Sequence, residues 1–191
     1  MVIDKNGITM NDSIEDKYLY YFCTTTSQKA SETYDAFSIL YANQKYATCV
    51  SLLRIQLDCY IRLLYLFAQT PDRRQTLLEE FYRGDKWKIS DYNMMGGVSH
   101  FGWERNVYKL GCSFIHLSRL SDMNNTNILT FVSEEDKQNI ISFINQYHNA
   151  ALTTEASNQD LIPYLPKIMD KITDNLLYEL NKELTTNITS Y

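Results

Sequence analysis

Two polar side chains, Ser113 and His116, lie three residues apart in an otherwise apolar segment of the chain. A spacing of i, i+3 places both on one side of a helix, so that the hydroxyl lies beside the imidazole. A histidine can act as a general base or acid near neutral pH. The simpler interpretation is a histidine near a helix end that makes a structural hydrogen bond. The pattern makes His116 a candidate catalytic residue and Ser113 its candidate partner.

Three charged residues, Arg54, Asp58 and Arg62, follow one another at intervals of four in the most apolar part of the chain. This spacing puts them on one side of a helix, where charges are costly unless they are paired. The order from Asp58 to Arg62 is the favourable one for an ion pair within a helix. The stripe predicts an internal salt-bridge network or a groove facing water. The functional alternative is a binding site or a polar dimer interface.

The charged stripe belongs to the clearest predicted helix, residues 44–69, whose apolar residues recur every three or four positions. Because apolar residues cover nearly all of its faces, we expect it to be the buried central helix of a bundle. Ser113 and His116 fall in another predicted helix, residues 104–119. Further helices are expected over residues 12–43 (one bent helix or two), 71–83, 134–147 (behind Ser133 as the capping residue) and 160–184. The longest irregular stretch is expected over residues 84–103.

These elements predict an all-α fold, an irregular up-and-down helical bundle of about five to seven helices. The length of 191 residues suits one domain. We expect the bundle to span residues 12–184. A flexible N-terminal arm is expected over residues 1–11 and a C-terminal tail over residues 185–191.

The overall charge and the cysteines exclude several classes of protein. The net charge of −5 and a pI near 5.2 argue against a protein that holds duplex DNA by bulk charge. The four cysteines form no C-x-x-C pair and sit in apolar runs, so they predict reduced core residues rather than a zinc site. There is no signal-peptide pattern, and no segment approaches the roughly 20 apolar residues that cross a bilayer. We expect a cytoplasmic protein that makes no membrane contact.

Motifs for phosphate loops, dinucleotide binding, zinc proteases and serine hydrolases are absent from the sequence. We therefore predict no cofactor and no metal. The remaining histidines, His100 and His148, are expected to have local structural roles, since nothing in the pattern recruits them to a site.

Two segments together resemble a known group of proteins. Residues 52–66 (LLRIQLDCYIRLLYL) are similar to the arginine- and acid-containing helix of a large group of bacterial helical proteins. Residues 108–116 (YKLGCSFIH) are similar to the helix of that group that ends in a histidine. The group is similar to the HEPN-like superfamily (higher eukaryotes and prokaryotes nucleotide-binding). The resemblance covers roughly residues 45–120 by motif and implies a helical bundle that forms a homodimer.

Many HEPN proteins are metal-independent ribonucleases in phage defence, toxin–antitoxin or stress systems, with four to six residues between an arginine and a histidine. The resemblance matches that histidine to His116. The arginine position falls on Gly111, Leu110 or Lys109, of which only Lys109 is basic. Arg54 on the neighbouring helix is the alternative source of a guanidinium.

Two functional hypotheses follow from the sequence. In the first, the protein is a ribonuclease that uses His116 as acid and base, with Arg54 or Lys109 stabilising the phosphate. Asp58 then orients Arg54, and Ser113 orients His116. In the second, which we favour, the protein is a non-catalytic dimeric module that binds RNA, a protein or a small ligand. The same polar residues then fix how the helices pack.

Overall fold

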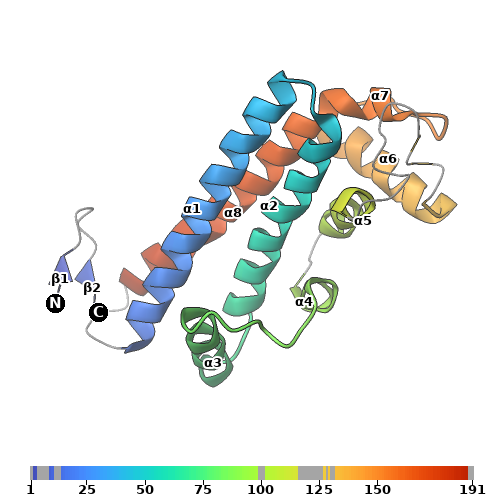
Figure 1. The fold of residues 1–191 in the computed structure, drawn as a ribbon. Coiled ribbons are helices and arrows are strands. Elements are labelled where there is room, and N and C mark those ends of the chain that lie inside the picture. Colours follow the sequence, from blue (N-terminus) through green and yellow to red (C-terminus); the bar gives the residue numbers. More distant parts are fainter. Residues whose placement is uncertain are drawn as a thin grey trace.

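The computed structural model describes the backbone of most of the chain (Figure 1). The described residues are 2–3, 9–10, 14–98, 102–115, 127, 129 and 132–188. Side chains are described for residues 17–98, 102–112, 127, 129 and 132–182. Within these ranges the protein is an all-α bundle, as predicted, with seven α-helices of eight residues or more.

The centre of the bundle consists of three long helices, α1 (Ile14–Ala42), α2 (Tyr46–Phe67) and α8 (Leu165–Ile188). All three contact one another, and Figure 1 shows them running side by side. The buried amide of Gln56 on α2 donates to the carbonyl of Ala30 on α1 at 3.3 Å and to the hydroxyl of Thr173 on α8 at 2.9 Å. Because a buried amide needs such partners, Gln56 fixes how the three helices pack.

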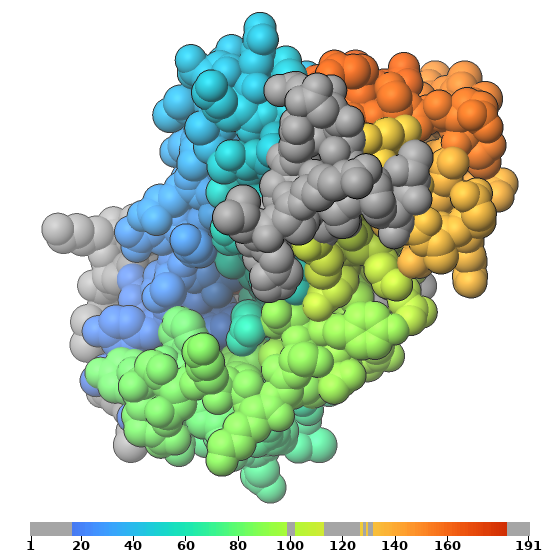
Figure 2. Space-filling model, turned by 45° about the vertical axis from the view of Figure 1, so that its right-hand side comes forward, coloured from blue at the N-terminus to red at the C-terminus, as the bar shows by residue number. Residues whose placement is uncertain are grey.

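Helix α2 is the central helix that the periodicity predicted for residues 44–69. Leu53, Leu57 and Ile61, which lie on one stripe, are almost completely buried. Besides α1 and α8, α2 contacts three shorter helices on its other side. In the view of Figure 2, α2 (teal) is visible only in part between the elements that cover it.

The region that could have been one helix or two is a single helix, α1, which runs without a break through three consecutive threonines. The hydroxyl of Thr24 donates to the carbonyl of Tyr20, four residues earlier, at 2.8 Å. Such a bond satisfies the side chain inside the helix. After α1, Gln44 adopts a positive φ of 58°, which turns the chain into α2.

The remaining elements are α3 (Pro71–Tyr82), α4 (Asp91–Val98), α5 (Trp103–Ile115), α6 (Glu134–His148), the single turn α7 (Asn158–Leu161) and a 3₁₀ turn, η3 (Ile162–Tyr164). Several predicted boundaries are confirmed. Pro71 occupies the first turn of α3, and Gly84, with φ of 79°, follows its end. Ser133 caps α6, because its side chain accepts from the backbone N–H of Asp136 at 3.0 Å.

The prediction of an irregular segment over residues 84–103 is wrong for α4. The hydroxyl of Ser90 accepts from the backbone N–H of Asn93 at 3.3 Å, which satisfies a free donor of the first turn. Met94, Met95 and Val98 are buried. The burial of these side chains outweighs the low helix propensity of the two glycines within α4.

The bounds of the last predicted helix also differ from the prediction. The final helix does not begin at residue 160, because α7 and η3 precede α8, and it continues beyond residue 184 to Ile188. Pro166 lies in the first turn of α8, where its missing N–H costs nothing. In the N-terminal arm, β1 (Val2–Ile3) pairs antiparallel with β2 (Thr9–Met10).

Candidate functional site

The predicted charged stripe of α2 forms a cluster around Arg54 where α2 meets α4 and α5. Arg54 is only 4% exposed. Its guanidinium forms an ion pair with Asp58 on the same helix and lies 3.5 Å from a carboxylate oxygen of Asp91 at the start of α4. A buried guanidinium is costly unless carboxylates compensate it. The two aspartates therefore allow Arg54 to be buried.

Asp91 is shared between two arginines. Its Oδ2 faces Arg54, and its Oδ1 accepts from Nη2 of Arg62 at 2.8 Å. The predicted ion pair between Asp58 and Arg62 is absent from the described residues, because Asp58 pairs with Arg54 instead. Arg54 and Arg62 each lie one helical turn from Asp58. Asp91 on α4 binds Arg62 more closely, which leaves Arg54 to pair with Asp58. Of the two predicted arrangements, the structure shows the internal network. We call Arg54, Asp58, Arg62 and Asp91 the Arg54 network.

Helix α5 packs directly on the Arg54 side chain. The guanidinium carbon lies 3.9 Å from the ring centre of Tyr108, which is within the range of a cation–π contact. One turn further along α5 is Gly111, where an added Cβ lies only 2.6 Å from the Cβ of Arg54. Gly111, at one of the positions that the resemblance assigns to an arginine, thus lets the two helices approach closely.

The exposed edge of this region is aromatic. The rings of Tyr92 on α4 and Tyr108 on α5 are 6.1 Å apart, edge to face. Arg105 donates to the hydroxyl of Tyr92 and lies over its ring at 5.3 Å. Figure 2 shows the segment from α3 to α5, in green to yellow-green, spread across the lower part of one face. Arg54 itself, only 4% exposed, lies against Tyr108 of this segment.

Lys109 does not join the Arg54 network. Its ammonium lies 3.1 Å from a carboxylate oxygen of Asp136 on α6, and its side chain is 38% exposed. The hydrogen bond from Lys109 lowers the pKa of Asp136, with a further contribution from Ser133. Lys109 therefore joins α5 to α6 at the surface.

The other two predicted site residues are only partly described. Ser113 lies within α5, but its side chain is outside the described residues, and so is all of His116. The structure thus brings Arg54 and Asp58 together and places Lys109 elsewhere. The predicted approach of Arg54 to His116 stays a prediction. His148 is half-buried, and burial followed by the charges of Lys167 and Lys171 lowers its pKa.

Residues that the sequence interpretation missed are Asp91 and Tyr108, the contacts of Arg54 on α4 and α5. The pair Ser90 and Asp91 carried a detectable signal, since a serine followed by an acid is typical of a helix start. The glycines that follow obscured it. Tyr108 carried no signal, because its role depends on how α5 crosses α2.

The described residues offer neither a metal site nor a membrane-spanning helix. No group of three histidine, cysteine or acidic side chains there could hold a metal ion. All four cysteines are free; Cys23 and Cys49 are buried, whereas Cys59 and Cys112 are half-buried. Within the described ranges, no helix combines the length and the apolar character needed to cross a bilayer.

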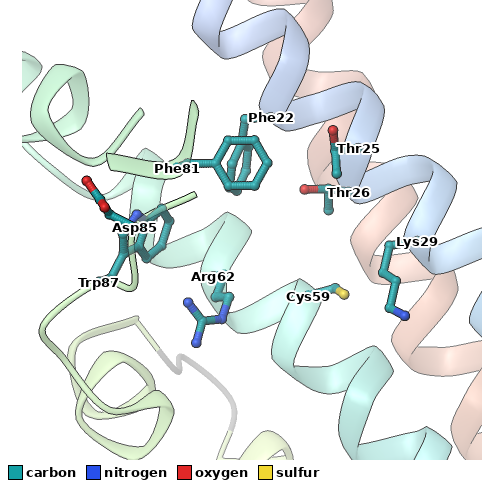
Figure 3. A pocket seen from close by; sticks show the side chains of 9 residues that line it. All are labelled: Phe22, Thr25, Thr26, Lys29, Cys59, Arg62, Phe81, Asp85 and Trp87. Carbon is teal, nitrogen blue, oxygen red and sulfur yellow. The ribbon is translucent and has the colours of Figure 1, made fainter. Parts of the chain in front are cut away.

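A separate pocket lies on the other side of Arg62, between α1, α2 and the segment that follows α3 (Figure 3). Its volume is about 190 Å³. The lining side chains are Phe22, Thr25, Thr26, Lys29, Cys59, Arg62, Phe81, Asp85 and Trp87. Of the described catalytic candidates, Arg54, Asp58 and Lys109, none lines it.

Comparisons of the chain with models of protein families, with curated proteins and with solved structures found no match. The likeness to HEPN-like proteins therefore depends on the two motifs in residues 52–66 and 108–116 alone.

Proposed function

We propose that this protein is a non-catalytic helical-bundle module that acts as a homodimer and binds another molecule. The observation that carries the proposal is the burial of Arg54 within a network of balanced charge. Its two arginines and two aspartates compensate one another. Such a network fixes the positions of α4 and α5 on α2, a role that buried polar groups can have.

The same observation counts against a ribonuclease that uses Arg54. Metal-free cleavage of RNA needs a cation that meets the charge developing on the phosphate. Arg54 is committed to Asp58 and Asp91, with Tyr108 against its plane. Turning it toward a substrate leaves Asp58 without its cation and Asp91 with Arg62 alone. Lys109 is likewise paired with Asp136 and lacks the two-pronged geometry that suits arginine to phosphate.

The dimer and the biological setting come from the resemblance. HEPN-like bundles often form homodimers and many act in phage defence or stress responses, so we infer the same assembly and a role of that kind here. Exposed apolar side chains such as Tyr178 and Leu177 on α8 offer surface suited to a protein contact. Sedimentation velocity of the full chain tests the assembly: a dimer is expected, and a monomer at tens of micromolar protein contradicts it.

Cleavage of a mixed RNA pool in EDTA tests the absence of catalysis. Wild type and His116→Ala are compared at equal concentration, with matching circular dichroism and melting as the control for folding. We expect no cleavage by either protein. Cleavage by wild type that is lost in His116→Ala, with folding unchanged, establishes the ribonuclease hypothesis and overturns the proposal.

A further inference from the structure

The pocket beside Arg62 has one apolar wall built from three aromatic rings. Phe22 lies edge to face with Phe81 at 5.0 Å and is stacked with Trp87 at 6.0 Å. The indole N–H of Trp87 donates to the carbonyl of Leu77 at 3.0 Å, which fixes the indole ring. Figure 3 shows the three rings gathered at one side of the pocket. A preformed wall of this kind binds a flat apolar group.

The side of the pocket away from the rings is polar and is lined by Lys29 and Thr26 on α1 (Figure 3). A second cation, the guanidinium of Arg62 on α2, lies over the Trp87 ring at 5.6 Å. Burial raises the pKa of the Cys59 thiol between them, and the charges of Lys29 and Arg62 both act against this rise. Lys29, Cys59 and Arg62 all line the pocket.

Charge balance identifies which cation is available to a ligand. Arg62 belongs to the Arg54 network, in which the charges compensate. Asp85, the one acid in the pocket wall, accepts from Nε of Arg83 at 2.9 Å. Lys29 forms no ion pair with any side chain that the structure describes. The pocket thus holds one uncompensated positive charge opposite an aromatic wall.

We propose that the pocket binds a small aromatic carboxylate. The ring lies against Phe22 and Phe81, and the carboxylate faces Lys29, while Arg62 lies over Trp87 at the edge of the same pocket. The size agrees, because a cavity of about 150 Å³ accommodates benzene and this one measures about 190 Å³. A nucleotide is too large, since pockets for ligands of that size begin at about 300 Å³.

This inference rests on the proposed function, a binding module, and adds the class of ligand. The proposed function and the ligand proposal can fail separately. A protein that cleaves RNA but binds the carboxylate contradicts the proposed function alone. A protein that neither cleaves RNA nor binds the carboxylate contradicts the ligand proposal.

Titration of the full chain with benzoate, followed by amide chemical shifts, tests the pocket. The ligand is raised to about 10 mM, because so small a molecule binds weakly. Saturable shifts are expected for residues around Thr26 and Trp87. Benzamide has the same shape but no charge. We expect it to bind at least about tenfold more weakly, because it loses the charged contact with Lys29.

Two variants and one chemical probe complete the test. Lys29→Gln is expected to weaken benzoate binding about tenfold, whereas Lys45→Gln, an exposed lysine outside the pocket, leaves it unchanged. In wild type, bound benzoate is expected to slow alkylation of Cys59 by iodoacetamide. The proposal is overturned if benzoate gives no saturable shifts, if benzamide binds equally well, if Lys29→Gln binds as wild type does, or if Cys59 reacts at the same rate with benzoate present.

Discussion

Replacing Gly111 by alanine is expected to destabilise the protein, although alanine is the better helix former. In the structure, the new Cβ lies 2.6 Å from the Cβ of Arg54 and 3.3 Å from its Cγ and Cδ. Carbon atoms in contact prefer about 3.5–4.0 Å. Both Cβ atoms are attached directly to helix backbone, so no change of rotamer relieves the overlap. Helix α5 must instead move away from α2.

The size of the effect follows from two opposing terms. Overpacking of this kind costs about 1–3 kcal/mol, and replacing glycine by alanine inside a helix contributes up to about 1 kcal/mol of stability. Movement of α5 also weakens the contact of Tyr108 with the Arg54 guanidinium. We expect a net loss of about 1–2 kcal/mol, which lowers the melting temperature of a chain of this length by about 2–8 °C.

Urea unfolding followed by far-UV circular dichroism measures the loss. Gly96→Ala is the matched control, because Gly96 is also helical but an added Cβ there meets nothing within 4 Å. We expect Gly96→Ala to be as stable as wild type or up to about 1 kcal/mol more stable. If Gly111→Ala gains stability as Gly96→Ala does, the close packing of α5 on Arg54 is refuted.

Three further predictions concern single side chains. Asp91→Ala is expected to cost about 2 kcal/mol in urea unfolding, because it leaves two arginines short of a carboxylate; a loss below about 0.5 kcal/mol contradicts this. Lys109→Ala is expected to cost less than about 1 kcal/mol, since both partners are partly exposed, and to raise the pKa of Asp136 in an NMR titration; an unchanged pKa refutes the pairing. The lowered pKa of His148 means that the unfolded state binds the proton more tightly, so stability falls as the pH drops through about 6.5. In His148→Gln, unfolding measured between pH 7 and 5 is expected to lose part of this dependence, and an identical dependence contradicts the assignment.

The sequence predicted the elements whose residues make a regular pattern. Helix α2 was predictable from its apolar period, and the start of α6 was predictable from Ser133, because both signals are local. Helix α4 was missed because its glycines indicate a loop, and only contact with α2 shows that its methionines belong to the core. Local sequence patterns therefore predict elements that depend on neighbouring residues in the chain, and miss elements that depend on tertiary contacts.

The candidate site was predictable only in part for the same reason. Arg54, Asp58 and Arg62 were recognised as residues that need partners. Asp91, however, comes from a helix 29 residues beyond Arg62, and no spacing rule reveals it. The pocket is harder still, because its walls come from three segments of the chain and its key property is the charge of Lys29 that remains uncompensated.

The central claim is that the Arg54 network holds α4 and α5 on α2. Amide hydrogen exchange of Arg54→Met tests it most directly, with Arg73→Met on α3 as the control. We predict that Arg54→Met lowers the protection of α4 and α5 well below that of α1 and α8, whereas Arg73→Met leaves all four helices protected. Wild-type protection of α4 and α5 in Arg54→Met contradicts the account.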